Sequence, residues 1–191
     1  MHDLGHATDE LAHVVSHVRD DDLDRPTPCA DWTVRDLLGH LLGLSAHFAA
    51  VARHDAPARG GPPQDLPADW KAELDSRLVD LGQAWRAPEA WEGEGSAGGV
   101  TMPNAQLGVV ALEEVVLHGW DLAQAIGIGL AVRDEDLAVV ADFVAGFEHA
   151  GQEARAGLYG PVVDAPGASE LDRVLALAGR DPAWSPAAAT S

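Results

Sequence analysis

Apolar side chains recur at helical spacing along most of the chain, and few stretches alternate as a strand would. We expect helices over residues 8–19, 33–53, 103–126 and 134–156, and another marked by Leu74, Leu78, Leu81 and Trp85. A final short helix is expected over 169–178, and only residues 160–164 hint at an extended piece. The stretches 56–67 and 88–103 are rich in Gly and Pro and predict long irregular connections. The pattern therefore predicts an all-α fold, a four-helix bundle with long crossover loops and a short C-terminal helical segment.

Signals at the helix ends support this interpretation. Thr33 with Asp36 three residues later forms a capping box, Pro103 suits a first helical turn, and Gly127 suits a helix stop. A chain of 191 residues can bury one sizeable core but is short for two. We expect a single domain over 1–186, with the bundle over about 7–156 and the C-terminal segment over about 157–186, followed by a disordered tail at 187–191.

Composition narrows the function classes. There are 31 acidic side chains against 12 Lys and Arg, giving a formal net charge of -19, which argues against nucleic acid and anionic membranes as partners. The only cysteine, Cys29, excludes an internal disulfide and a multi-thiolate zinc site and favours a reducing compartment. No leader pattern or run of roughly 20 apolar residues occurs, so we expect a cytoplasmic protein. The sequence leaves a homodimer open.

Three polar side chains interrupt the apolar face of the helix predicted over 103–126, namely Glu114, His118 and Asp121. An ionised carboxylate buried without a partner costs several kcal/mol, so Glu114 requires a cation, a proton or a strong donor. Glu114 and His118 lie one helical turn apart, within reach of a common ion. His40 lies among the leucines of the second helix and can be the third ligand of a divalent metal. Two imidazoles and one carboxylate leave coordination positions open, as in catalytic zinc and mononuclear iron sites.

Each of these residues also has a simpler interpretation. An inward histidine such as His40 is more often a hydrogen-bonded core residue than a ligand. Asp121 either orients His118 or forms an ordinary buried salt bridge. Glu113 lies about 140° from the direction of His118 and is expected to face solvent.

Further candidates surround this set. His47 is expected to line the pocket one or two turns from the ion and to support catalysis or contact substrate, and His54 to be exposed at the helix end. The pair His13 and His17 is expected on the surface. Cys29 is either a small packing residue or a thiol near the mouth of the site. Of the six tryptophans, Trp120 is the candidate for contacting substrate.

Three motifs resemble a known family: Thr27-Pro28-Cys29-Ala30-Asp31-Trp32-Thr33-Val34-Arg35-Asp36-Leu37-Leu38-Gly39-His40-Leu41, then Glu114-Val115-Val116-Leu117-His118-Gly119-Trp120-Asp121-Leu122-Ala123, and Gly179-Arg180-Asp181-Pro182-Ala183-Trp184. They are similar to actinobacterial metal-binding proteins grouped with the mycothiol-dependent maleylpyruvate isomerase N-terminal domain, in the DinB-like superfamily. The resemblance implies a DinB-like bundle with a divalent ion, typically zinc, on His40, Glu114 and His118.

The resemblance also implies an activity. The open coordination position of the superfamily would receive a thiolate, here from mycothiol, so a thiol S-transferase or isomerase acting on a small electrophilic metabolite is expected. The maleylpyruvate isomerase has a further C-terminal domain that contributes to its active site, whereas this chain has only a short segment after its fifth helix, so maleylpyruvate itself is not the expected substrate. The alternatives are a non-catalytic regulatory or partner-binding module that uses the ion structurally, and a metal-free bundle whose inward polar groups satisfy one another.

Overall fold

The computed structural model describes residues 1–29, 31–55, 66–149, 155, 158–165, 167 and 169–186. Its elements are α1 (Gly5–His17), the 3-10 turn η1 (Asp20–Asp22), α2 (Val34–Ala52), α3 (Trp70–Ala84), η2 (Pro88–Trp91), β1 (Glu94–Ala97), β2 (Val100–Pro103), α4 (Asn104–Ile126), α5 (Asp134–Ala145) and α7 (Glu170–Leu177). The mostly helical architecture confirms the all-α, DinB-like prediction.

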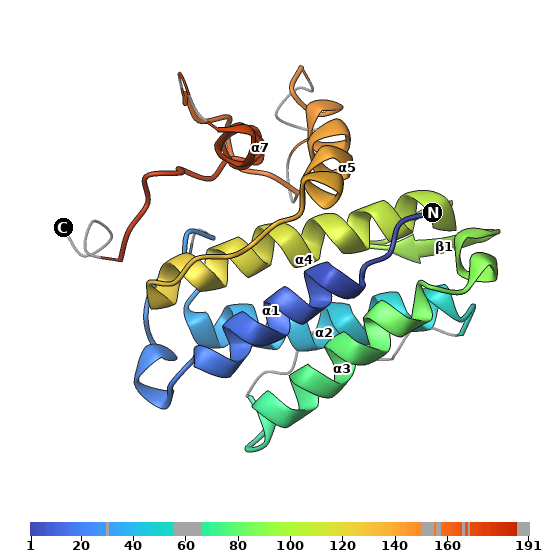
Figure 1. Ribbon diagram of the computed structural model, residues 1–191, viewed down its shortest axis with the longest axis horizontal. Helices are drawn as coiled ribbons and strands as arrows, with labels where there is room; N and C mark the ends of the chain where they lie inside the picture. Colours follow the sequence, from blue (N-terminus) through green and yellow to red (C-terminus); the bar gives the residue numbers. More distant parts are fainter. Residues whose placement is uncertain are drawn as a thin grey trace.

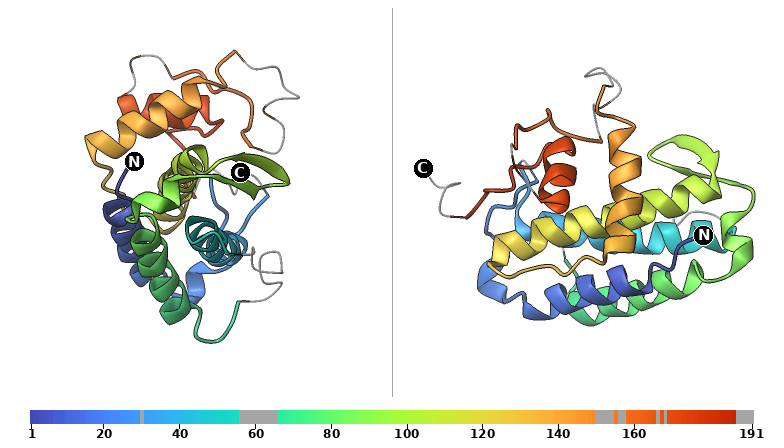
Figure 2. Two further views of the ribbon diagram at one scale, coloured as in Figure 1. Left: turned by 90° about the vertical axis from the view of Figure 1, so that its right-hand side faces the viewer. Right: turned by 45° about the horizontal axis from the view of Figure 1, so that its top comes forward.

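The helices α1, α2, α3 and α4 lie side by side and form the bundle, as Figure 1 shows. Each turns an apolar stripe inward, and the stripes meet in a core of fully buried side chains that includes Leu11, Leu38, Leu41, Leu74, Leu78 and Leu112. Across α4, on the side away from α3, lie α5 and α7, which pack against each other (Figure 2). We call α5, α7 and the described residues between and after them, up to Trp184, the outer layer.

Local sequence determines where the main helices begin and end. The Thr33 hydroxyl caps α2 by accepting a hydrogen bond from the amide of Asp36, and the Asp36 carboxylate accepts one from the Thr33 amide. At the other end of the chain, Ser169 and Asp172 form the same capping box on α7. The helix α4 ends at Gly127, whose left-handed φ of 77° favours glycine over any other residue.

The prediction of no strand is wrong for the connection at 88–103. There β1 and β2 pair as an antiparallel hairpin, with Ala97 opposite Val100 and only Gly98 and Gly99 between them. Both glycines have positive φ, 57° and 81°, as a two-residue hairpin turn with right-handed strand twist requires. Each strand has four residues, too few and too poor in β-branched side chains for alternation to reveal them.

The fifth helix is shorter than predicted. It begins at Asp134 as expected but ends at Ala145, where Gly146 follows as the C-cap. Glycine lowers helix propensity by about 1 kcal/mol relative to alanine, which the apolar periodicity of this stretch did not reveal. Most of the predicted connection 56–67, the end of this helix prediction and the predicted tail at 187–191 lie outside the described residues. Within the described part of the chain, no helix combines the length and apolar character needed to cross a membrane.

Candidate metal centre

Two neighbouring helices bring His40, Glu114 and His118 together. His40 lies on α2, and Glu114 and His118 lie one turn apart on α4, which packs against α2. The Oε2 atom of Glu114 is 3.3 Å from Nε2 of His40 and 3.1 Å from Nε2 of His118. The ligand atoms of the three side chains all lie within 4.8 Å of one another. The geometry therefore allows all three to contact one small cation.

The three side chains lie at the boundary between core and solvent. The side chain of His118 is 10% exposed, whereas those of His40 and Glu114 are 28% and 26% exposed. Solvent thus reaches one side of the set, while the other side is held by the bundle. An ion bound here would keep positions open toward that exposed side.

On the buried side, Asp121 fixes the orientation of the His118 ring. Its Oδ2 atom is 3.0 Å from Nδ1 of His118, and the guanidinium of Arg180 donates to both Asp121 oxygens at 3.2 and 2.9 Å. With its Nδ1 proton directed at Asp121, His118 presents Nε2 toward Glu114. The position of Asp121 thus fits the orienting role considered from the sequence.

The charged groups of this cluster lie close enough to change one another's pKa values. Burial opposes the charged form of His118, but hydrogen bonds to Asp121 and Glu114 outweigh it and raise the pKa of the imidazole to about 9. Burial would raise the pKa values of Glu114 and Asp121, but His118 lowers both, assisted by His40 at Glu114 and by Arg180 at Asp121. Without a metal, a proton on His118 supplies the positive charge that the two carboxylates require.

An aromatic side chain that the sequence reasoning passed over covers this cluster. The ring of Trp32 stacks on His118 with centroids 5.8 Å apart and an interplanar angle of 20°, and its centroid is 4.9 Å from that of His40. Trp32 lies directly before the Thr33 cap of α2. Its place in the same motif as His40 was the available signal.

The two side chains proposed from sequence to contact substrate have other partners in the structure. Trp120 is only 5% exposed and belongs to the bundle core. The Nε2 atom of His47 is 2.9 Å from the carbonyl oxygen of Ser96, in the hairpin. Their roles toward substrate stay predictions, while the exposed positions of His13, His17 and His54 match expectation.

The thiol of Cys29 lies beside the cluster. Its Sγ forms a second potential ligand group with His118 and Asp121, all within 4.8 Å, and the residue is partly buried. Burial and the nearby charge of Asp121 raise the pKa of the thiol to about 11, so it is protonated at neutral pH. This position agrees with the alternative of a thiol near the site, and the raised pKa means that the thiol is not an activated nucleophile.

The expectation that Glu113 faces solvent is wrong. Glu113 is 6% exposed and shares a hydrogen bond with the Tyr159 hydroxyl. Burial and the adjacent charge of Glu114 raise the pKa of Glu113 to about 8. The angle of about 140° between Glu113 and His118 predicts exposure only if one face of α4 is covered. The outer layer covers a second face, and the apolar periodicity of α4 does not reveal it.

Comparison with known proteins agrees with the family resemblance of the sequence motifs. Residues 4–123 match the family model described as the mycothiol maleylpyruvate isomerase N-terminal domain. Two uncharacterized proteins of Mycobacterium tuberculosis, from strains CDC 1551 / Oshkosh and ATCC 25618 / H37Rv, are each 30% identical over 135 residues, which is 70% of this chain and 70% of each relative.

Solved structures support the fold. The crystal structure of the mycothiol-dependent maleylpyruvate isomerase superposes with a TM-score of 0.57 at 17% identity, and that of a point mutant with a TM-score of 0.61 at 16% identity. Each comparison covers 95% of this chain and 79% of the other, so the similarity extends beyond residue 123 into the outer layer.

Proposed function

This chain belongs to the mycothiol maleylpyruvate isomerase N-terminal domain family, and on that premise we propose that it is a metal-dependent enzyme acting with a low-molecular-weight thiol. The thiol is mycothiol, the substrate is a small electrophilic metabolite, and the reaction is an S-transfer or an isomerisation. The resident ion is zinc, held by His40, Glu114 and His118. We place the reaction in the cytoplasm, because the lone Cys29 suits a reducing compartment.

The observation that carries this proposal is the convergence of two imidazole nitrogens on one carboxylate oxygen. Nε2 of His40 and Nε2 of His118 both lie within 3.3 Å of Oε2 of Glu114. Because Asp121 accepts from Nδ1 of His118, a neutral His118 would direct the Nε2 lone pair at an anion. A proton on His118 or a metal ion between the two atoms removes that repulsion, and three donor atoms within reach of one point fit a divalent ion.

A divalent ion in this place would lower the pKa of a bound thiol and so make a thiolate available at neutral pH. The protein residues supply the surroundings. Asp121, held by Arg180, keeps the proton on Nδ1 of His118 and leaves Nε2 free as a ligand. Trp32 provides an apolar wall beside both histidines, and the exposed edges of His40 and Glu114 leave a solvent-facing entrance for thiol and substrate.

The two other polar side chains considered from sequence, Asp121 and His47, both have partners that keep them from filling a fourth coordination position. Asp121 is engaged by His118 and Arg180, and His47 contacts the backbone of Ser96. This supports an open coordination position, and therefore catalysis, over a purely structural ion.

The first test is elemental analysis of purified protein. We expect about one zinc per chain in the wild type, a large loss in Glu114→Gln, and full retention in His17→Ala, which removes an exposed imidazole as a matched control. A metal-to-protein ratio near zero in both wild type and Glu114→Gln would overturn the metal assignment.

The second test is turnover. Electrophiles of the unsaturated-acid class should be consumed only when both mycothiol and metal are present, and His118→Ala should abolish that consumption. Counting free thiol separates the two reactions, since isomerisation returns the thiol whereas transfer consumes it. Turnover that survives removal of the metal would refute the proposal.

A further inference from the structure

The turn that precedes α2 is closed on itself by hydrogen bonds. The amide of Thr27 donates to the carbonyl oxygen of Trp32 at 3.1 Å, and the amide of Trp32 donates to the carbonyl oxygen of Cys29 at 3.1 Å. The buried Thr27 hydroxyl donates to the same two carbonyl oxygens, at 3.0 and 3.1 Å. We call the described residues of this segment, 27–29, 31 and 32, the Trp32 turn.

The backbone of the Trp32 turn is strained at Asp31. Among the residues that the structure describes, only Asp31 and His54 combine a side chain with a positive φ, 67° and 58°. His54 lies directly after the C-cap of α2, where a left-handed residue commonly closes a helix. Asp31 instead lies within the Trp32 turn, and its side chain is exposed. A left-handed residue other than glycine persists where the surrounding contacts impose it, often beside a functional site.

The Trp32 turn places the indole of Trp32 against both imidazoles of the candidate metal centre. The indole is stacked on His118 at an interplanar angle of 20° and lies closer still to His40, with ring centroids 4.9 Å apart. The two imidazoles contact each other edge to face, with centroids 4.8 Å apart. The three rings form one packed group, so displacing the indole would free both imidazoles to rotate.

The indole adds a restraint that the polar contacts do not supply. The Asp121 carboxylate holds His118 at one atom, Nδ1, about which the ring can still tilt. A flat ring packed on the face of His118 limits that tilt. Ligands of a bound ion have to be held within roughly 0.5 Å of their working positions, so a restraint of this kind affects how tightly an ion is bound.

We propose that the Trp32 turn is a positioning device for the imidazoles of His40 and His118, in which Thr27 and Asp31 are positioning residues that act through the Trp32 indole. Thr27 closes the turn, and the left-handed backbone at Asp31 directs the indole onto the rings. The consequence for zinc affinity rests on the proposed function, whereas the placement of the rings does not.

The first measurement is the proton NMR spectrum of the metal-free protein, at constant pH, for the imidazole C–H signals of His40 and His118. The ring current of the packed indole shifts these signals, and Trp32→Leu gives their positions without it. Thr27→Val removes a hydroxyl but keeps the indole, and it should move both signals toward their positions in Trp32→Leu. Thr27→Ser keeps the hydroxyl and should restore the wild-type signals.

A second pair of variants tests the backbone at Asp31, whose exposed side chain can be exchanged without loss of core packing. Asp31→Val introduces a β-branched residue that rarely adopts positive φ, and it should shift the same two imidazole signals. Asp31→Asn removes the same charge but tolerates the left-handed region, so it should leave the signals unchanged. Because Asp31 and Thr27 are changed independently, a folding failure of one variant does not prevent the test.

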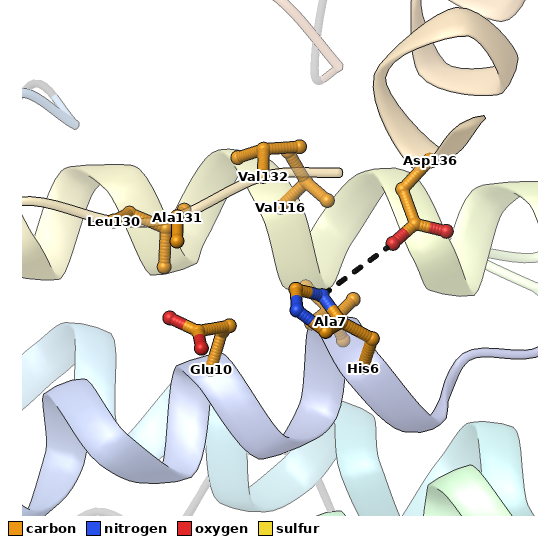
Figure 3. A pocket seen from close by; sticks show the side chains of 9 residues that line it. His6, Ala7, Glu10, Val116, Leu130, Ala131, Val132 and Asp136 are labelled. Carbon is orange, nitrogen blue, oxygen red and sulfur yellow. Dashed lines mark ion pairs between the residues drawn. The ribbon is translucent and has the colours of Figure 1, made fainter. Parts of the chain in front are cut away.

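His6 provides the reference imidazole. It faces Asp136 across a small, mostly apolar cavity between α1 and the start of α5, as Figure 3 shows. The cavity is lined from α1, α4 and residues 130–136, so the His6 signals should stay in place in all variants of the Trp32 turn. A shift at His6 equal to that at His118 would mean that the variants disturb the whole fold, and would overturn a local positioning role.

Zinc affinity is the second measurement, by chelator competition with variants shown to be folded by circular dichroism. Thr27→Val and Asp31→Val should each bind zinc roughly tenfold more weakly than the wild type, and Thr27→Ser and Asp31→Asn as tightly. Unchanged imidazole signals in Thr27→Val and Asp31→Val would overturn the proposal, whether or not the wild type binds zinc. A wild type that binds no zinc, with shifted signals in both variants, would overturn the metal assignment alone and support the positioning of the rings.

Discussion

In the bundle, α1 to α4 meet through leucine and valine side chains, many of them fully buried. The outer layer also contributes apolar groups to that core, but its described residues include two buried arginines. The guanidinium of Arg155 donates to the carbonyls of Phe147, Gly160 and Leu177, and that of Arg180 to Asp121 and the carbonyl of Ala178. The bundle, which carries the proposed metal ligands, is thus held mainly by non-directional burial of apolar groups. The outer layer, which orients one of those residues, is held to a large extent by directional hydrogen bonds.

The largest expected effect tests the bundle. Leu112→Ala, at a fully buried side chain of α4, should lower the free energy of unfolding by about 2–5 kcal/mol, because a cavity remains in the core. Leu175→Ala removes the same group from a fully buried position in α7, where fewer elements surround the cavity, and should cost less. Urea denaturation followed by circular dichroism measures both. An equal or larger loss in Leu175→Ala would contradict the difference drawn between the two regions.

The second prediction tests the outer layer. Arg155→Met keeps much of the side-chain volume but leaves three backbone carbonyls without their donor, at a cost of about 3 kcal/mol. Hydrogen exchange should show the loss mainly in the amides of α7, since Leu177 belongs to that helix. Arg155→Lys retains the charge but cannot reach three carbonyls, so it should recover only part of the stability. If the α7 amides of Arg155→Met exchanged as slowly as those of the wild type, apolar contacts alone would hold the outer layer.

The third prediction concerns the connection between the regions. Asp121→Asn should weaken zinc binding by about 10–100-fold, because the partner that fixes the His118 ring is lost. Arg180→Met should act through the same carboxylate, so the double variant should be little worse than either single one. Competition with a chromogenic chelator measures the affinities, with the exposed Asp142→Asn as control. Additive losses would mean that Arg180 acts independently of Asp121.

The same contrast explains what the sequence could predict. The bundle helices and the grouping of His40, Glu114 and His118 followed from periodicity, because a polar side chain on an apolar helix face points into the core and needs a partner there. Contacts made by side chains to backbone carbonyls have no periodicity, so the anchoring role of Arg155 left no signal in the pattern. Arg180 stood in a recognised motif, but its pairing with Asp121 spans 59 positions and became visible only in the structure.

The hairpin and Glu113 escaped prediction for a related reason. Both depend on what packs against them: β1 lies against the bundle at Gly95, where an added Cβ would come within 2.8 Å of Asn104 and 2.9 Å of Leu107. Glu113 is buried by the outer layer, beside Tyr159. The apolar periodicity of a sequence shows which face of a helix or strand is covered. It does not show which other segment of the chain packs there, and both the hairpin and Glu113 depend on such a segment.

Matched capping boxes provide a smaller test of the comparison. Thr33→Ala removes the cap of α2 in the bundle, and Ser169→Ala removes the cap of α7 in the outer layer. Each should cost about 1 kcal/mol. The first should lower global stability in urea, whereas the second should appear mainly as faster hydrogen exchange within α7. If both variants changed only global stability, the layer and the bundle would unfold as one unit.

The smallest predicted effect is a pH dependence confined to the α2 cap. The Thr33 hydroxyl and amide both donate to the Asp36 carboxylate and lower its pKa from 3.8. Because the folded-state pKa lies below the unfolded value, the carboxylate stabilises the fold fully above pH 3.8, and this contribution is lost as the pH falls through the lowered pKa. Asp36→Asn should therefore be less stable than wild type at pH 6, and the difference should shrink in acid. Thr33→Ala removes the stronger of the two donors, so its stability should change less with pH. Urea denaturation at several pH values measures this. If the stability of Thr33→Ala falls in acid as steeply as that of the wild type, the hydroxyl does not lower the pKa of the carboxylate.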